Sequence, residues 1–330
     1  MSAGRRYWGV WTTGKLEVLE RYLDGFTTTA KNKSSEILYF DLFGGRAENI
    51  ERLTNKVLRG SPSIALSIHD KAFTRLRFFE LDPRHAAELR ITLEQDHPGR
   101  DFEVIAGDCN QEIGTVLRRL QTVNWAPAFA FIDPNGPDVA WTTLEALARF
   151  KRPDRRKVEL WILLADAMFM RSLPKDGSVS FADAAKLTAM YGSGDWRLIY
   201  NARVDEDIDP AEAREEYVNL MRWRLQETLG YRWTHPLEFR TESGRPIYHM
   251  IFATDHELGT KIMTSLYSSA KKRFPAMRQK AKNTRRRLEE EQRGVHNLFG
   301  EAIDGIVAGQ PQGGKDAYEY LPPWPPFGWE

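Results

Sequence analysis

The chain has 330 residues, 42% hydrophobic and 28% charged, with a net charge of +1. These proportions are typical of soluble globular proteins and exclude disorder along the whole chain. With Cys109 as its single cysteine, the chain cannot form an internal disulfide or a thiolate zinc cage. It contains no apolar signal-peptide run and no uncharged stretch of about 18 residues, so we expect a cytoplasmic protein without a membrane span.

Apolar residues at intervals of three and four predict a first helix over residues 15–26. Strand, turn and helix patterns then recur. Strands are expected within 36–45, 76–82, 102–108, 128–136 and 158–165, and helices over 47–58, 85–95, 113–121 and 141–150. Ser61 is expected to cap a further helix over 63–73. Repeated β–α units of short apolar strands indicate a parallel sheet covered on both faces.

The second half of the chain has a different pattern. Residues 181–191 and 212–230 are helical in pattern, whereas residues 235–254 read as a hairpin around Ser243-Gly244. We therefore predict a doubly wound, Rossmann-like α/β fold of methyltransferase type, mainly parallel, with a terminal antiparallel hairpin. The predicted units are a core with an N-terminal helix over 1–165, a helical insertion over 166–230, the closing hairpin and helix over 231–270, and a basic helix with a Pro/aromatic tail over 271–330.

Four predicted strands end in an acid. Asp41 precedes the turn Phe43-Gly44-Gly45, and Glu80, Asp108 and Asp133 end the next three strands. Ligands of doubly wound sheets bind at this carboxyl edge, where glycines let the backbone approach. The alternative for each acid is that it caps the following helix or faces solvent.

S-adenosylmethionine fits this pattern better than NAD, because no GxGxxG sequence is present. Glu80 would accept hydrogen bonds from both ribose hydroxyls, Asp108 beside Cys109 would accept from the adenine amino group, and Gly44-Gly45 would lie against the methionine part. These residues, with Asp41 and Phe43, form the predicted cofactor site.

The sequence Asp133-Pro134-Asn135-Gly136 is expected where a substrate meets the transferable methyl group. Methyl transfer is an in-line displacement that depends mostly on alignment. Asp133 would accept a hydrogen bond from the nucleophile, and the Pro134 carbonyl a second one. The alternative is an ordinary turn, which the DPNG sequence also favours.

Several segments together resemble the three-Cys-motif partner protein (TcmP) family: WTTGKLEVLERYL, FDLFGG, GSP, FFELD, GDCNQEI, FIDPNG and YHMIFATDHELGTKIM. The resemblance runs from about Trp11 to about Leu266. It implies a class I methyltransferase-like domain, with Asp41, Gly44 and Gly45 in the first cofactor motif, Glu80 in the second, Asp108 in the third and Asp133 in the fourth. It also implies a partner protein that carries the cysteine motif and resembles radical-type metalloenzymes.

Two motifs depart from the family pattern. Arg46 and Ala47 replace Pro and Gly of the usual DLFAGPG, and Asn135 replaces the aromatic residue of FIDPYG. In amino-group methyltransferases an aromatic residue near this point stacks on a flipped base. Trp141 or Phe169 would have to take its place.

Residues 271–293 hold ten basic and three acidic residues. A nucleic acid is one partner for such a segment, and solvent or an acidic protein is the alternative. Arg171 could face the cleft and bind an anionic group. The predicted substrate or nucleic-acid contacts are Arg171, Lys271, Lys272, Arg273, Arg285, Arg286 and Arg287. Trp324, Phe327 and Trp329 of the Pro-rich tail are expected to dock on the chain itself or on a second copy.

These observations favour an S-adenosylmethionine-dependent methyltransferase that acts on a nucleic acid or nucleotide-like substrate. The second hypothesis is a catalytically degenerate binding module that recruits a partner protein or nucleic acid, as the altered motifs would suggest. The third is a hydrolase that uses Asp41, Glu80, Asp108 and Asp133 as a magnesium cage. The glycine turn argues against the third, because a metal cage needs no close approach of the backbone.

Overall fold

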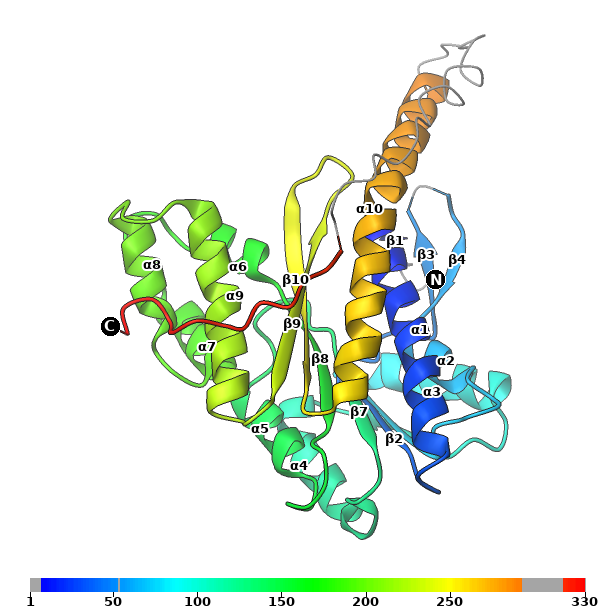
Figure 1. Ribbon diagram of the computed structural model, residues 1–330. Helices are drawn as coiled ribbons and strands as arrows, with labels where there is room; N and C mark the ends of the chain where they lie inside the picture. Colours follow the sequence, from blue (N-terminus) through cyan, green and yellow to red (C-terminus); the bar gives the residue numbers. More distant parts are fainter. Residues whose placement is uncertain (1–6, 53, 293–316, 330) are drawn as a thin grey trace.

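The computed structural model describes residues 7–52, 54–292 and 317–329. A seven-stranded sheet forms its centre, in the order β6-β5-β2-β7-β8-β10-β9 (Figure 1). The strands are β2 (Leu38–Asp41), β5 (Arg75–Glu80), β6 (Phe102–Ala106), β7 (Ala128–Ile132), β8 (Glu159–Leu164), β9 (Trp233–Arg240) and β10 (Pro246–Thr254). β10 runs antiparallel to both β8 and β9, whereas β6, β5, β2, β7 and β8 are mutually parallel. The predicted fold class is confirmed.

Helices cover both faces of the sheet, so its central strands are buried throughout. Every residue of β2, β7 and β8 is buried, which explains why these strands are apolar except for Asp41 at the end of β2 and Glu159 at the start of β8. One core lies under α1 (Val10–Lys31), α2 (Ser61–Leu66), α3 (Pro83–Asp96) and α10 (Glu257–Gln292). The other lies under α4 (Cys109–Arg119), η1 (Gln121–Val123), α5 (Trp141–Arg149), α6 (Asp166–Ser172), α7 (Phe181–Tyr191), α8 (Trp196–Val204) and α9 (Pro210–Glu227).

The helix predicted over 47–58 is wrong. These residues form β3 (Glu48–Glu51) and β4 (Val57–Arg59), an antiparallel pair that joins β1 (Tyr7–Trp8) in a separate small sheet. Asn55 has a φ of +55°, a turn conformation that no helix contains. Ile50 and Val57, which were expected on one helix face, are instead paired across the two strands. Leu53 lies outside the described residues.

The helix predicted over 63–73 is shorter than expected. α2 ends at Leu66, and Gly60 occupies the N-cap position without a side-chain cap. The Ser61 hydroxyl hydrogen-bonds to Asp41 instead of capping the helix. This segment therefore anchors the end of β2.

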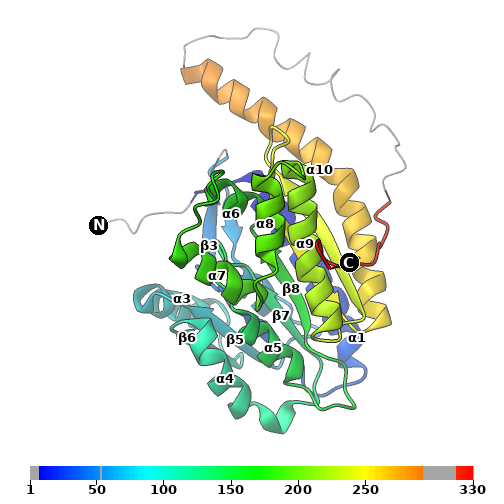
Figure 2. The ribbon, with the colours of Figure 1, turned by 90° about the vertical axis from the view of Figure 1, so that its left-hand side faces the viewer.

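The helices α6 to α9 fill residues 166–230 and share one hydrophobic core with α4 and α5. The limits of the predicted units stay predictions. The tail, residues 317–329, crosses β9 and α9 in an extended path (Figures 1 and 2). Asn219 on α9 exchanges two hydrogen bonds with the Trp324 backbone, of 2.9 and 3.0 Å. The structure thus places the tail on the chain's own surface.

No helix in the described part of the chain combines the length and the apolar character needed to cross a bilayer. The cytoplasmic location stays a prediction.

Candidate active site

A cleft of about 990 Å³ opens at the carboxyl edge of the parallel strands. The turns after β2, β5, β6 and β7 form one side, and α1 and β10 contribute the other. Of the sequence-predicted residues, nine line it: Phe43, Gly44, Gly45, Glu80, Asp108, Cys109, Asp133, Pro134 and Asn135. The topology thus brings together residues that are up to 92 positions apart in sequence.

The turn after β2 packs its backbone against β5. The Gly44 amide donates to the Phe79 carbonyl at 2.7 Å, and a Cβ on Gly44 would lie 3.3 Å from that oxygen. Gly45 has a φ of +61°, in the left-handed region that favours glycine. Both glycines expose backbone to the cleft. This is the cradle that a nucleotide-like ligand needs at a strand end.

Asp41 supports this turn from below and does not line the cleft. It is fully buried, and its Oδ1 accepts a hydrogen bond from the Phe43 amide at 3.3 Å. Burial raises the pKa of Asp41 to about 7, although hydrogen bonds from Ser61 and Phe43 act in the opposite direction. Asp41 is therefore a positioning residue for the glycine turn.

Glu80 ends β5 with its side chain 16% exposed. Its Oε1 accepts from the Asp82 amide at 3.0 Å, while Asp82 itself caps α3. His85 on α3 lies 3.9 Å from Glu80 and 3.0 Å from the guanidinium of Arg46, and both basic residues line the cleft. The acid is thus fixed at the rim by the start of α3.

Asp108 caps α4, because its Oδ1 accepts from the Asn110 amide at 2.9 Å. Its carboxylate therefore caps the following helix, which was the alternative interpretation of this acid, and the residue also lines the cleft. Cys109 is buried, and burial raises the pKa of its thiol to about 12. This thiol is not a nucleophile at neutral pH.

Asn110 holds the loop after β7 in place. Its side chain donates to the Asp138 carbonyl at 2.8 Å and accepts from the Ala140 amide and the Thr143 hydroxyl, each at 2.8 Å. The Asp133-Pro134-Asn135-Gly136 turn therefore has a rigid support on α4. Asn110 was not predicted as a site residue, although it falls within the GDCNQEI segment that carries the TcmP resemblance.

Asp133 forms a partly buried ion pair with Lys15 of α1, whose side chain is 6% exposed. The Lys15 ammonium also lies 5.5 Å from the ring centre of Tyr248 on β10. The Tyr248 hydroxyl is buried and has no hydrogen-bond partner among the described residues. Burial, with the Asp133 charge as the second cause, raises the pKa of Tyr248. An unsatisfied hydroxyl in a polar cleft is a place for a ligand group.

Lys15 and Tyr248 were not predicted as site residues, because their elements are far from the strand-end acids in the sequence. Both fall within segments that carry the TcmP resemblance.

Several sequence-predicted contacts lie elsewhere. Trp141 and Phe169 are buried in the core under α5 and α6, so neither can replace the missing aromatic residue. Arg171 is exposed on α6 and does not line the cleft. Tyr248 and Phe43 are aromatic residues that do line it.

The basic residues of α10 lie outside the cleft, and several of them have contacts within the chain. Arg273 pairs with Glu17 at 2.8 Å, Arg285 pairs with Glu242, and Lys271 lies over the Tyr318 ring. Arg286 lies 3.7 Å from Glu290, and Lys272 and Arg287 are on the same helix. The distal half of α10 projects beyond the carboxyl edge of the sheet (Figure 1). Arg293, the last residue of the basic stretch, lies with residues 294–316 outside the described residues.

The magnesium cage is wrong for the described residues, because no three His, Cys, Asp or Glu side chains among them are grouped to hold a metal ion. Asp41 lies beneath the glycine turn, Asp108 caps a helix and Asp133 pairs with Lys15.

No family model matches the chain, and no curated protein matches it. Among solved structures it is similar to protein LPL1258 of Legionella pneumophila, with 12% identity over 78% of this chain and 91% of that one and a TM-score of 0.41. It is also similar to an O-methyltransferase from Bacillus cereus in complex with SAH, with 14% identity, 74% and 80% coverage and a TM-score of 0.36. A third is M. jannaschii TYW2 in complex with AdoMet, with 10% identity, 73% and 75% coverage and a TM-score of 0.32. At these TM-scores the similarities do not bear on the activity of this chain.

Proposed function

We propose that this protein is an S-adenosylmethionine-dependent methyltransferase. The observation that carries the proposal is the single cleft in which the Gly44-Gly45 backbone, Glu80 and the Asp133–Lys15–Tyr248 group meet at the carboxyl edge of a doubly wound sheet. Its volume of about 990 Å³ is large enough for a nucleoside-sized cofactor together with a small substrate.

The residues divide the cleft into two ends. At one end, Glu80 would accept hydrogen bonds from two ribose hydroxyls, and the glycine turn would hold the amino-acid part of the cofactor. At the other end, the Tyr248 hydroxyl and the Asp133 carboxylate would orient the nucleophile of the substrate. Bound S-adenosylmethionine supplies an activated methyl group for in-line displacement. The protein's contribution is alignment and the exclusion of water.

Glu80→Gln tests the cofactor site. The amide can donate to one ribose hydroxyl but no longer offers a charged acceptor, and such hydrogen bonds contribute about 1.5–3 kcal/mol, or roughly 10- to 150-fold in affinity. Calorimetric titration with S-adenosylmethionine and S-adenosylhomocysteine should give saturable binding to the wild type. The variant should bind both compounds with an affinity that is lower by this factor.

The matched control is Glu94→Gln, on the exposed face of α3. It should bind both compounds as the wild type does. Equal affinity in Glu80→Gln would remove Glu80 from the ribose site, and no binding to the folded wild type would reject the cofactor.

For the substrate, we propose a nucleic acid or a nucleotide-like compound. The support is the basic stretch on the half of α10 that projects past the edge carrying the cleft (Figure 1). The TcmP resemblance adds a metalloenzyme partner to the proposal. Contacts of Arg273 and Arg285 with acids of the same chain reduce the charge available for phosphates.

The alternative proposal is a catalytically degenerate module that recruits a partner protein or nucleic acid. The Asp133–Lys15 ion pair favours it, because a carboxylate neutralised within the chain is a weaker acceptor for a nucleophile. Cofactor binding without turnover on any nucleic acid, nucleotide or partner-bound substrate would support this alternative.

A further inference from the structure

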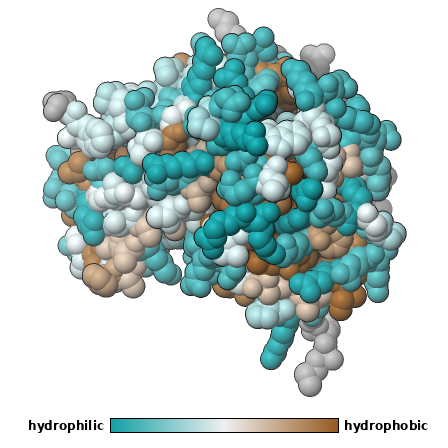
Figure 3. Space-filling view, turned by 90° about the horizontal axis from the view of Figure 1, so that it is seen from below, coloured by the Kyte–Doolittle hydropathy of each residue, from teal (hydrophilic) through white to brown (hydrophobic). Residues whose placement is uncertain are grey.

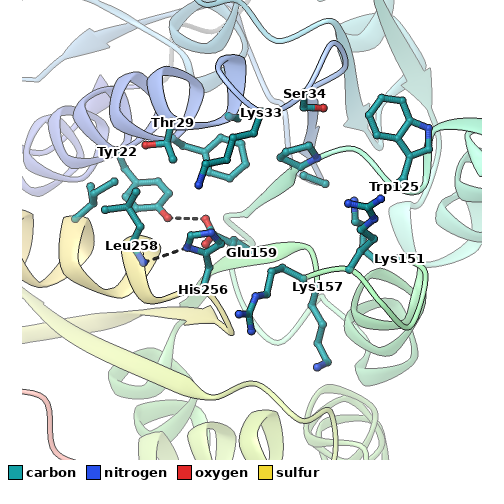
Figure 4. A pocket seen from close by; sticks show the side chains of 18 residues that line it. Tyr22, Thr29, Lys33, Ser34, Trp125, Lys151, Lys157, Glu159, His256 and Leu258 are labelled. Atoms are coloured by element: carbon teal, nitrogen blue, oxygen red, sulfur yellow. Dashed lines mark hydrogen bonds between the residues drawn. The ribbon is translucent and has the colours of Figure 1, made fainter.

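A second cavity, of about 250 Å³, lies at the opposite edge of the sheet, where the parallel strands begin. Figure 3 views the molecule from this edge and shows hydrophobic residues between hydrophilic ones. α1 contributes one wall, and the starts of β7, β8 and α10 contribute the others (Figure 4). The cavity shares no residue with the cleft.

Five basic side chains line this cavity: Lys33 from the loop after α1, and Lys151, Arg155, Arg156 and Lys157 from the connection between α5 and β8. Glu159 is the one carboxylate in the lining. Such an excess of one sign in a concave site attracts ions of the other sign.

Three of these basic side chains donate hydrogen bonds to backbone carbonyl groups, which carry no net charge. Lys151 donates to the Ala126 carbonyl, Arg156 to the Asp255 carbonyl at 3.0 Å, and Lys157 to the Gly230 carbonyl at 2.9 Å. Carbonyl oxygens position a cation without cancelling its charge. Two carboxylates stand nearby, with Asp255 at 3.6 Å from Lys157 and Asp154 at 3.4 Å from its neighbour Arg155.

Glu159 does not compensate the excess either. It is buried, and its two oxygens accept hydrogen bonds from Tyr22 at 2.5 Å and Thr254 at 2.7 Å. Burial raises the pKa of Glu159 to about 7, so near neutral pH it carries only part of its charge. Glu159 is therefore a structural part of the cavity wall, with both carboxyl oxygens already hydrogen-bonded within the chain.

The lining also has an apolar part, which includes Phe26, Trp125, Pro127 and Ile262, together with a few neutral polar side chains such as Thr29 and Ser34. α10 also begins here, with the Leu258 amide bonded to the His256 ring at 3.0 Å. Gly259 lets this first turn touch the wall, since a Cβ would lie 2.3 Å from Glu159 Oε1. The positive end of a 36-residue helix thus faces the basic side chains.

We propose that this cavity binds a small organic phosphate that carries a flat ring, of the nucleoside monophosphate class. Arginine and lysine side chains suit a phosphate dianion, and aromatic and proline surfaces suit a ring. The cavity volume of about 250 Å³ matches a mononucleotide rather than a dinucleotide. The site is separate from the cleft, and the proposal does not rest on the methyltransferase activity.

The probes are 5′-AMP, adenosine and inorganic phosphate, titrated calorimetrically into the full chain. We expect saturable binding of 5′-AMP at least tenfold tighter than that of either adenosine or phosphate. The double variant Lys33→Gln/Arg155→Gln, in which both changed side chains are exposed, should weaken 5′-AMP binding by tenfold or more. Its fold is checked by circular dichroism.

The matched control removes two exposed cations from another face, as Arg149→Gln/Lys186→Gln, and should bind 5′-AMP like the wild type. Glu80→Gln, in the cleft, should leave 5′-AMP binding unchanged as well. Equal weakening in both double variants, loss in Glu80→Gln alone, or no saturable binding of 5′-AMP would overturn the proposal. If phosphate binds as tightly as 5′-AMP, the proposal that the cavity recognises a ring is wrong. If adenosine binds as tightly as 5′-AMP, the proposal that the cavity recognises a phosphate is wrong.

Discussion

Lys15 and Asp133 are the clearest case in which single residues decide the character of the cleft. Their side chains are 6% and 14% exposed, so both charges are largely removed from water. Removing one partner of a buried pair leaves the other charge uncompensated, at a cost of about 3–5 kcal/mol, whereas replacing both is much milder. The pair therefore couples α1 to the end of β7.

Denaturant unfolding of Lys15→Met, Asp133→Asn and the double variant measures this coupling. Each single variant should lose about 3 kcal/mol of unfolding free energy, and the double variant clearly less than the sum. The exposed pair Arg59–Glu20, at 2.6 Å, is the control, because surface pairs contribute only about 0–1 kcal/mol. Additive losses for Lys15 and Asp133 would show that they act independently.

Two buried carboxyls give the protein a defined pH dependence. Burial raises the pKa of Asp41 from 3.8 to about 7 and that of Glu159 from 4.5 to about 7. At a pH between the unfolded and the folded pKa, each of these two carboxyls is protonated in the folded chain and ionised in the unfolded chain. Stability from these groups is therefore fully present below pH of about 4 and is lost as the pH rises to about 7.

Glu159→Gln should flatten the fall in melting temperature between pH 4.5 and pH 7, because the amide does not titrate. The quantity to measure is the difference in melting temperature between variant and wild type at each pH. Glu36 acts on stability in the opposite direction at lower pH, because a hydrogen bond from Arg75 lowers its pKa, and this effect cancels in the difference. Parallel profiles for the two proteins would contradict the assignment.

At the scale of elements, the buried parallel strands were predictable, because fully apolar runs between helical segments have few other structures available. The β3–β4 hairpin was not. Ile50 and Val57 are spaced as on a helix, and only the turn at Asn55 and the pairing with β1 distinguish the strands. The strand-end acids were predictable by spacing, but Lys15 reaches Asp133 from another element, and no local pattern encodes that contact.

Gly60 connects this hairpin to the segment that follows the Gly44-Gly45 turn. Its amide donates to the Ala47 carbonyl at 2.7 Å, and a Cβ would lie only 2.1 Å from the Arg46 carbonyl oxygen. Gly60→Ala should therefore lower the unfolding free energy by about 1–3 kcal/mol and weaken S-adenosylmethionine binding. Gly114→Ala is the control, since its nearest neighbour would be 3.7 Å away within α4, and it should raise stability by up to about 1 kcal/mol. Unchanged cofactor affinity in Gly60→Ala would separate the hairpin from the site.

At the scale of the whole molecule, the tail joins three parts of the fold. The Tyr318 amide donates to Ser268 on α10 at 3.0 Å, and Asn219 on α9 holds the Trp324 backbone. Gly328 reaches Leu198 on α8. The tail thus links the helices on the two faces of the sheet across its β9 edge (Figure 2).

Asn219→Ala should lower the unfolding free energy by about 1–3 kcal/mol, because the Trp324 amide and carbonyl lose their partner. Cofactor affinity should not change, since no tail residue lines the cleft. Phe181→Ser is the control, as that ring is 91% exposed. A variant as stable as the wild type would mean that the Asn219 contacts with Trp324 add nothing to the stability of the fold.

The buried Cys109 makes the protein its own reporter of ligand binding. As the only cysteine, buried in the first turn of α4 beside the cleft, it should react with a thiol reagent only when this part of the core opens. A ligand in the cleft would slow that reaction. A compound in the cavity at the opposite edge would change the reaction rate only through its effect on the global stability of the fold. A reactive cysteine introduced at any exposed position can likewise be labelled in the folded chain without a cysteine-free background.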